Sequence, residues 1–288
     1  MAWAAPRWMR PALASLALAS IVASWLWTRE RAEIGGAGEN VEFAYPAAPR
    51  AATCDASASP HDAAPLRTAG GVALTVRAPS NYDPTYAHAL LVVFAPAGAD
   101  RFVTERFTGL TATATRAGFI VAYVDHKPLS QATIRDLGTV PAVLAQTWCI
   151  DARRIFLTGH SDGGTVATAL AVWAEPTRPY AGIAPSAAGF TGADLAAYRC
   201  PSPLAVIVAH GAADELFPGF GKEAAAWWAA CNKCEAAAPA RRADGCVEYR
   251  GCATGARTVY CEHAARHIAW PSWNDTLIDF FVASAPSS

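Results

Sequence analysis

Charged side chains are scarce in this 288-residue chain, since Asp, Glu, Lys and Arg make up only 16% of it. About a quarter is usual for a soluble domain. The formal net charge is −1, and the sequence shows neither a basic stripe nor an acidic tail. Clustered positive charge is the mark of nucleic-acid binding, so we expect no nucleic-acid partner. Internal repeats are also lacking, and the 53% hydrophobic content is ample for one large core.

Zinc-finger and redox signatures are missing as well. Cys231 and Cys234 form one C-x-x-C, but no second C-x-x-C or H-x-x-x-H follows at zinc-finger spacing, and nothing thioredoxin-like surrounds it. The eight cysteines are an even number, and five of them fall between residues 231 and 261. This pattern is typical of structural disulfides in an exported protein. We predict at least three, chiefly tying the 231–261 segment to itself, although the pairing of eight cysteines cannot be deduced from sequence.

Residues 1–31 have the features of a targeting segment. Arg7 and Arg10 precede the uncharged run Pro11–Trp27, which at 17 residues is short for a membrane span and slightly long for a signal core. Ala17-Leu18-Ala19 offers a cleavage site, but the apolar run continues past it. A cleaved signal peptide and an uncleaved N-terminal membrane anchor therefore stay open as alternatives. Both place the rest of the chain outside the cytoplasm, either secreted or periplasmic, or tethered to the membrane.

The strongest signal in the sequence surrounds Ser161. A β-rich apolar run, Arg154–Thr158, leads into Gly-His-Ser-Asp-Gly, and an Ala-rich segment with helical spacing follows at once. This is a G-x-S-x-G elbow in its strand–turn–helix setting. Gly159 and Gly163 remove the Cβ atoms that would obstruct the sharp turn. The alternative is a Gly-Ser loop that caps an ordinary helix. The flanking strand and helix favour Ser161 as a nucleophile.

A serine nucleophile needs a base and a carboxylate that orients the base, and after such an elbow the chain order is Ser, acid, His. Asp214 follows the predicted strand Pro203–Ala209 on a strand-end loop, where the acid is expected. Its neighbour Glu215 would point elsewhere because it is shifted by one residue. The alternative for Asp214 is a turn or helix-capping aspartate. We predict Asp214 as the acid.

Three histidines follow the elbow and are candidates for the base. His210 is tied to the strand end that carries the acid, whereas His263 and His267 both follow the predicted strand Thr258–Cys261. We predict His267 because it lies in the loop just before the final helix, with His263 as the second choice. His160, the variable residue of the elbow, is expected to pack beside the site.

An oxyanion hole needs two N–H donors where negative charge develops in the reaction. Asp162, the residue after the nucleophile, is predicted to supply one. The other is expected from the loop after the predicted strand Ala89–Phe94. Pro96 has no N–H, so Ala97 is the predicted donor, with Gly98 second. The alternative is that this loop is an ordinary Pro-Gly turn.

Strands alternating with helices predict an α/β fold, with a mostly parallel central sheet and helices on both faces. We divide the chain into the targeting segment 1–31, a linker or irregular arm 32–70, and a catalytic domain 71–288. The expected strands are Val72–Ala78, Ala89–Phe94, Phe119–Val124, the elbow strand, Gly182–Ala184, Pro203–Ala209, Val247–Arg250 and Thr258–Cys261; the expected helices are Thr104–Ala117, Ile134–Thr147, the elbow helix, Gly221–Cys231 and Ser272–Ala283.

Several motifs together resemble the extracellular polyhydroxybutyrate depolymerase and feruloyl esterase group of α/β-hydrolases, over about residues 89–284. The resemblance implies the α/β-hydrolase fold, with Ser161 as nucleophile, Asp214 as acid and His267 as base. It also implies a secreted serine ester hydrolase without metal or cofactor, acting on short-chain, hydroxyalkanoate or hydroxycinnamoyl-type esters. The matching pieces are Cys149-Ile150-Asp151, the run Arg154–Gly164, the loop His210–Pro218, Tyr249-Arg250-Gly251-Cys252 and His267 with Trp270-Pro271.

The chain departs from that group in two places. It has Ala95-Pro96 where the group carries a His-Gly pair in the oxyanion loop, and Ala265-Arg266 where the group has glycines before the catalytic histidine. It also has no appended binding module for insoluble polymers, which favours smaller esters. A serine peptidase of the same fold and a non-catalytic exported binding protein are the alternative functions. The complete Ser, Asp, His order argues against the second of these.

Overall fold

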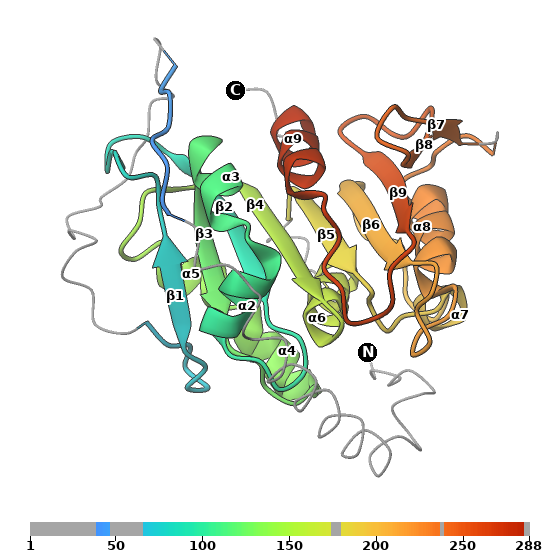
Figure 1. The fold of residues 1–288 in the computed structure, drawn as a ribbon, viewed down its shortest axis with the longest axis horizontal. Helices are drawn as coiled ribbons and strands as arrows, with labels where there is room; N and C mark the ends of the chain where they lie inside the picture. The colour runs from blue at the N-terminus through green and yellow to red at the C-terminus, as the bar shows by residue number, and fades with distance from the viewer. Residues whose placement is uncertain (1–38, 47–65, 174–179, 237–238, 285–288) are drawn as a thin grey trace.

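The computed structural model describes residues 39–46, 66–173, 180–236 and 239–284. Within these residues, a nine-stranded sheet of order β1-β3-β2-β4-β5-β6-β9-β8-β7 runs through the molecule, with helices on both faces (Figure 1). The six central strands are parallel, and the antiparallel pairs lie at the two edges. The strands are β1 (Leu74–Arg77), β2 (His88–Phe94), β3 (Phe119–Val124), β4 (Ile150–His160), β5 (Gly182–Ser186), β6 (Ala205–Gly211), β7 (Ala240–Arg241), β8 (Val247–Tyr249) and β9 (Arg257–His263).

Helices cover both faces because the central strands are apolar on both sides. Every residue of β2 and β3 is buried, as expected for parallel strands between helical layers. One core contains side chains of α4 to α8, and the other contains side chains of α3 and α9. The helices are α2 (Arg101–Thr108), α3 (Thr111–Arg116), α4 (Gln131–Leu137), α5 (Val140–Leu144), α6 (Asp162–Val172), α7 (Gly192–Leu195), α8 (Phe220–Cys231) and α9 (Asn274–Ser284).

Two helices expected from the sequence are each divided into two. The predicted helix Thr104–Ala117 is wrong as a single element, because Gly109 adopts a left-handed conformation (φ 59°) that ends α2. The predicted helix Ile134–Thr147 is divided into α4 and α5. Pro141 lies in the first turn of α5, where its missing N–H costs nothing, so a new helix starts there instead of the old one continuing.

The described part of the predicted arm is irregular in conformation and packs against the domain. The N–H of Val41 donates to Thr115 Oγ1 at 3.0 Å. The rings of Phe43 and Tyr45 lie against Tyr86 and His88. The predicted targeting segment lies outside the described residues. Among the helices that are described, none has the length and apolar character needed to cross a membrane.

Disulfides fasten the edge of the sheet that contains β7, β8 and β9. Cys234–Cys252 and Cys246–Cys261 tie the 231–261 segment to itself, as expected, and Cys200–Cys231 joins it to the residues after α7. The two cysteines of the C-x-x-C therefore have different partners.

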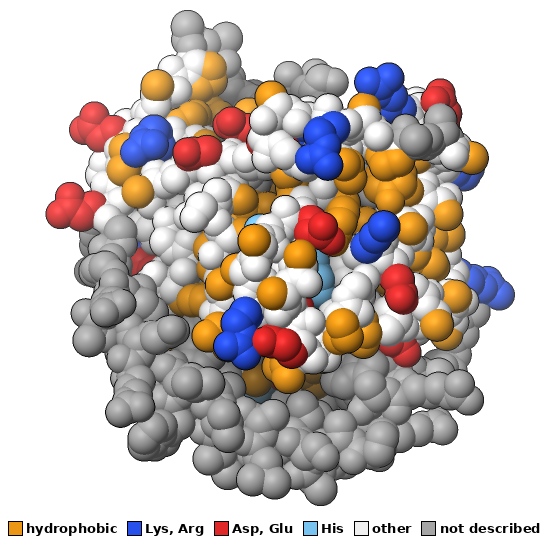
Figure 2. Space-filling model, turned by 45° about the vertical axis from the view of Figure 1, so that its right-hand side comes forward, with side chains coloured by type: hydrophobic (Ala, Val, Ile, Leu, Met, Phe, Trp, Pro, Cys, Tyr) orange, Lys and Arg blue, Asp and Glu red, His pale blue; other side chains and the backbone are white. Residues whose placement is uncertain are grey.

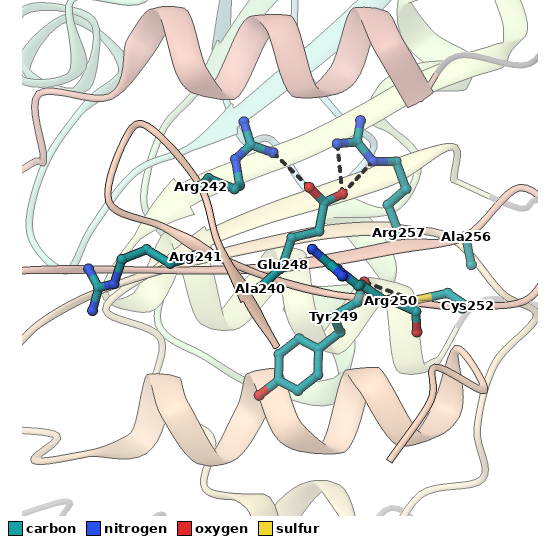
Figure 3. Close-up of a pocket in the computed structure, with 10 residues that line it drawn as sticks. Ala240, Arg241, Arg242, Glu248, Tyr249, Arg250, Cys252, Ala256 and Arg257 are labelled. Atoms are coloured by element: carbon teal, nitrogen blue, oxygen red, sulfur yellow. Dashed lines mark hydrogen bonds and ion pairs between the residues drawn. The ribbon is translucent and has the colours of Figure 1, made fainter. Parts of the chain in front are cut away.

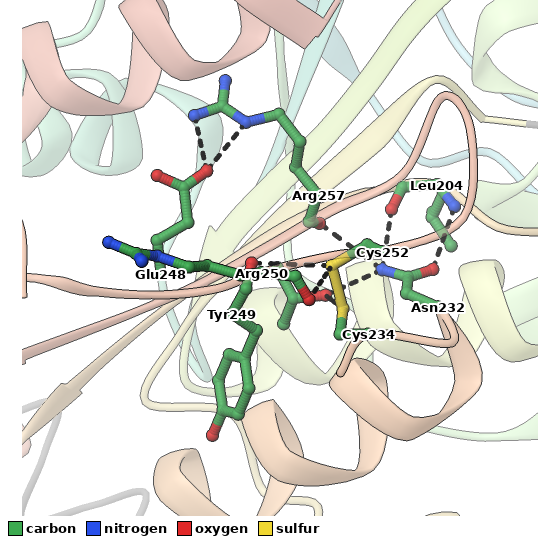
Figure 4. The surroundings of a disulfide bond; sticks show 9 residues. Leu204, Asn232, Cys234, Glu248, Tyr249, Arg250, Cys252 and Arg257 are labelled. Atoms are coloured by element: carbon green, nitrogen blue, oxygen red, sulfur yellow. Dashed lines mark hydrogen bonds and ion pairs between the residues drawn. A yellow bond between two sulfur atoms is a disulfide. The ribbon is translucent and has the colours of Figure 1, made fainter. Parts of the chain in front are cut away.

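Buried Asn232, which lies between the two cysteines of the C-x-x-C, adds polar links at the same place. Its amide nitrogen donates to the Leu204 carbonyl and to Thr258 Oγ1, both at 2.9 Å (Figure 4). The end of α8 is thus fixed to both β6 and β9.

Peptide mapping without reduction should recover these three pairs. Replacing Cys246 and Cys261 together by Ser should lower the free energy of unfolding by about 3 kcal/mol, because this bridge closes a loop of 15 residues. The Cys200→Ser/Cys231→Ser variant is a matched control with a 31-residue separation, and should lose slightly more. Urea denaturation measures both. A peptide linking Cys231 to Cys234 would contradict the pairing.

Candidate active site

Ser161 lies on a strained turn between β4 and α6. Its φ of 54° and ψ of −116° are unusual for a residue with a side chain. The turn is held by a hydrogen bond of 2.9 Å from the Ser161 N–H to the Ser186 carbonyl of neighbouring β5. A Cβ on Gly163 would lie 2.0 Å from the Phe94 carbonyl oxygen, and one on Gly159 would lie 2.6 Å from Gly163. Only glycine fits at both positions.

The structure brings Ser161, His267 and Asp214 into one hydrogen-bonded line. His267 Nε2 lies 2.9 Å from Ser161 Oγ, and His267 Nδ1 lies 2.7 Å from Asp214 Oδ2. An ionised carboxylate can only accept, so Nδ1 carries the proton and Nε2 is free to accept from the serine hydroxyl. This is the arrangement that a serine nucleophile requires.

The Asp214 carboxylate is stabilised in its ionised form. Burial by itself raises the pKa of this group, but hydrogen bonds from His267 and from the Phe217 N–H outweigh it, and the pKa is lowered. The other oxygen, Oδ1, accepts from the N–H groups of Leu216 and Phe217 at 2.9 and 2.8 Å. Glu215, the adjacent carboxylate, is instead paired with Arg266 at 2.5 Å on the exposed side of the loop.

The histidines not predicted as the base occupy supporting positions. His210 Nε2 donates to the Phe217 carbonyl at 2.8 Å, which closes the loop that carries Asp214. His263, the second choice, ends β9, and its carbonyl accepts from Ala212 at 2.7 Å. Among the histidines that the structure describes, only His267 is hydrogen-bonded to the Ser161 side chain.

His160 is buried behind His267 and holds its backbone. Its Nε2 donates to the His267 carbonyl at 2.6 Å, and its Nδ1 then accepts from Ser186 Oγ at 3.0 Å. Burial, reinforced by nearby His267, lowers the pKa of His160 to about 3, so the ring stays neutral. The expectation that His160 packs beside the site agrees with this geometry, but its bond to the His267 backbone could not be read from the sequence.

The loop after β2 forms a tight turn above the elbow. The N–H of Ala95 donates to the Val124 carbonyl, and that of Ala99 donates to the Pro96 carbonyl. Gly98, the second choice for the oxyanion donor, directs its N–H to His126 Nδ1 at 3.3 Å. Among the described hydrogen bonds of this loop, none takes up the N–H of Ala97.

Asp162 begins α6, so its N–H has no acceptor inside the helix. Its side chain, by contrast, has a partner, because Asp162 Oδ2 lies 3.1 Å from His126 Nε2. No motif in the sequence assigns His126 a role. The available signal was its place two residues after β3, at the carboxyl edge of the sheet, where ligands bind in such folds.

Aromatic rings lie against His160 and His267. Phe217 meets His267 edge-on at 5.0 Å between ring centroids, and Phe107 meets His160 at 5.2 Å. Trp270 lies 6.3 Å from both Phe107 and His160. On the face drawn in Figure 2, histidine side chains are visible between hydrophobic ones, and acidic and basic side chains are interspersed. The surroundings of the histidines are therefore largely apolar.

A cavity of about 430 Å³ lies elsewhere, along β7, β8 and the start of β9. Glu248 at its centre accepts hydrogen bonds from Arg242 and Arg257 (Figure 3). Arg257 begins β9 and His263 ends it, so this cavity lies at the opposite end of the strand from the triad. The paired charges indicate a structural ion cluster.

Solved structures of several hydrolases resemble this chain. An acetyl xylan esterase from Aspergillus awamori matches with a TM-score of 0.58 and 17% identity, over 73% of this chain and 94% of that one. An S-formylglutathione hydrolase from Staphylococcus aureus matches with a TM-score of 0.52 and 13% identity, over 75% and 93%. An esterase from Pyrobaculum calidifontis matches with a TM-score of 0.55 and 12% identity, over 77% and 85%. No family model and no curated protein sequence matches the chain.

Similarity at this level of identity establishes the fold. The chain is a protein of the α/β-hydrolase fold, as the sequence predicted. The narrower resemblance to the polyhydroxybutyrate depolymerase and feruloyl esterase group stays a prediction.

The buried neutral His160 should make the protein sensitive to acid. The unfolded chain protonates this side chain near pH 6.5, whereas the folded chain does so only near pH 3. Stability is therefore full above pH 6.5 and is lost as the pH falls toward 3, by up to about 1.4 kcal/mol per pH unit from this residue. In urea denaturation across this window, His160→Asn should show a shallower decline than the unchanged protein. Equal slopes would contradict the assignment.

Proposed function

We propose that this protein is a serine carboxylic-ester hydrolase that acts through an acyl-enzyme. The observation that carries the proposal is the hydrogen-bonded line from Ser161 through His267 to Asp214, built on the strained elbow. The substrates are carboxylic esters of small size, of the short-chain, hydroxyalkanoate or hydroxycinnamoyl type. The structural neighbours described above, two esterases and an S-formylglutathione hydrolase, support ester chemistry.

In the first stage, Ser161 Oγ attacks the ester carbonyl while His267 Nε2 takes its proton. Asp214 holds the ring in the required tautomer and stabilises the imidazolium that forms. The protonated His267 then gives its proton to the leaving alcohol as the tetrahedral intermediate collapses. The result is a Ser161 ester and a free alcohol.

In the second stage, water replaces the alcohol and the same groups act again. His267 removes a proton from the water as it attacks the acyl carbonyl, and then returns the proton to Ser161 Oγ. Because Asp214 stays ionised throughout, each stage needs only one proton, which His267 Nε2 takes up and then gives back. No metal or redox step is needed to balance the reaction.

The backbone N–H groups of Asp162 and Ala97 are the proposed oxyanion donors. The dipole of α6 adds to the first, because the helix begins at Asp162. The Ala97 donor is supported by elimination within the loop. The N–H groups of Ala95, Gly98 and Ala99 all have acceptors, and Pro96 has no N–H.

An oxidising compartment suits the proposed enzyme. The three disulfides between described cysteines support export, because such bonds do not persist in a reducing cytoplasm. The N-terminal segment 1–31 would supply the targeting signal or anchor. A serine peptidase uses the same residues, so the test must compare an ester with the matching amide.

Purified protein should hydrolyse a short nitrophenyl ester far faster than the matching anilide. Ser161→Ala should lower kcat by about 10⁴-fold or more, and His267→Ala should be nearly as damaging. His263→Ala is the matched control, because that residue is near the site but not bonded to Ser161. Unchanged turnover in Ser161→Ala would contradict the proposal, and faster cleavage of the anilide than of the ester would favour a peptidase.

Ala97→Pro tests the second oxyanion donor. The turn Pro96–Ala99 has Gly98 at φ 73° in its third position, and turns of this kind accept proline in the second position. The substitution removes the N–H and keeps the turn. We expect kcat to fall by about 10²–10³-fold, the usual effect of losing one donor. Normal turnover in a variant with an unchanged melting temperature would exclude Ala97.

A further inference from the structure

His126 joins the two sides of the proposed oxyanion hole. Its ring lies between the turn after β2 and the first residue of α6. Nδ1 accepts from the N–H of Gly98 at 3.3 Å, and Nε2 lies 3.1 Å from Asp162 Oδ2. Its backbone N–H donates to the Ala99 carbonyl at 3.2 Å. One residue therefore contacts both ends of the Gly98–Ala99 segment and the elbow helix.

The two ring contacts fix the tautomer of His126. A backbone N–H can only donate, so Nδ1 has to be the acceptor and carries no proton. The proton is then on Nε2, where it donates to the Asp162 carboxylate. Both ring nitrogens are thus matched to their partners in the neutral imidazole. This leaves the ring no freedom to turn without losing a bond.

Each partner of His126 is adjacent to a proposed donor. Gly98 follows Ala97 in the chain, and Asp162 supplies the other donor from its own backbone. A hole of this kind works only if its N–H groups are preorganised before charge develops. The imidazole ring of His126 bridges the β2 turn and the first residue of α6.

The bond to His126 also affects where the negative charge of the Asp162 carboxylate lies. A negative charge next to an oxyanion hole disfavours the oxyanion, more so where water is excluded. The hydrogen bond from His126 Nε2 holds the carboxylate on the side of β3 and offsets part of its charge. A lost bond would release the carboxylate beside the developing oxyanion.

The start of α2 holds the same segment from the other side. Asp125, the residue before His126, accepts from the Arg101 N–H at 2.8 Å and from its guanidinium at 2.9 Å. Asp100 caps the same helix through the Val103 N–H. The chain around His126 is therefore fixed, and the ring projects from a rigid base.

We propose that His126 is a positioning residue of the oxyanion hole, which couples the turn that presents the Ala97 N–H to the helix that presents the Asp162 N–H. The proposal rests on the proposed ester hydrolysis. Among the described hydrogen bonds, His126 has none to Ser161, Asp214 or His267, so its loss should affect the transition state more than substrate binding.

The test compares His126→Ala, His126→Asn and Asp162→Ala with the unchanged enzyme, using a short nitrophenyl ester. His126→Ala should lower kcat by about 10–10²-fold, less than the loss of a donor itself, and change KM less than about threefold, since substrate binding before the transition state is spared. Asn carries an amide oxygen at the place of Nδ1 and can still accept from Gly98, so it should recover part of kcat. Asp162→Ala keeps its backbone N–H but loses the carboxylate that holds the His126 ring, so its kcat should also fall.

Lys127→Ala is the matched control. Lys127 is the next residue in the chain, and its ammonium group bonds to the Gly70 carbonyl at 3.0 Å, away from the elbow. Its kcat should equal that of the unchanged enzyme. Affinity for a trifluoromethyl ketone, which forms an oxyanion on serine, should fall in His126→Ala by the same factor as kcat.

The double variant His126→Ala/Asp162→Ala decides whether the two residues act together. Its kcat should fall by less than the product of the two single effects. Strictly multiplicative effects, a kcat of His126→Ala within twofold of the unchanged enzyme, or an Asn variant no better than Ala would each overturn the proposal. If the unchanged protein does not hydrolyse the ester, the proposed function is wrong, and this inference fails with it.

Discussion

The close crossing of the elbow over the end of β2 is the constraint on which the site depends. Gly163 packs its Cα against the Phe94 carbonyl, at a distance that leaves no room for any side chain. This contact sets the start of α6 against the turn that follows β2, and it keeps Ser161 in a backbone conformation that costs energy. The strain is offset by the burial of β2 and β4 in the centre of the sheet, where neither strand can yield.

Parallel pairing then brings distant parts of the sequence to one edge. Phe94 pairs with Gly159 in register, and Gly211 pairs with His263, so the loops after β2, β4, β6 and β9 all leave the carboxyl edge of the sheet. Asp214 and His267 belong to the last two of these loops. The bond from Ala212 to the His263 carbonyl joins those two loops before Asp214 and His267 are reached. The geometry of the hydrogen-bonded line from Ser161 to Asp214 is thus a property of the sheet register as much as of the three residues.

The elbow around Ser161 and the position of Asp214 could be predicted from the sequence because each has a local sequence pattern. Glycines around a serine, a buried apolar strand and an aspartate after it are visible in a short window. What it could not supply depends on long-range contacts or on the conformation of single residues. The break at Gly109 needs a left-handed backbone that the helical spacing of its neighbours conceals. The bonds of His126 and His160 join residues 36 and 107 positions away, and no local pattern reports them.

The disulfides act where the helical layers give the least support. Strands β7 and β8 are short, and β7 is the edge strand of the sheet, with hydrogen-bonding partners on one side only. Cys246–Cys261 and Cys234–Cys252 fasten this edge to β9 and to the end of α8. Strand β9 carries the loop of His267 from its carboxyl end, so a slip of β9 against β6 would move His267 away from Ser161. Cys246–Cys261 ties β9 to the residue before β8, and Asn232 at the end of α8 bonds both to Leu204 before β6 and to Thr258 in β9. These links hold β9 in place, and the 2.9 Å contact between His267 and Ser161 lies beyond its carboxyl end.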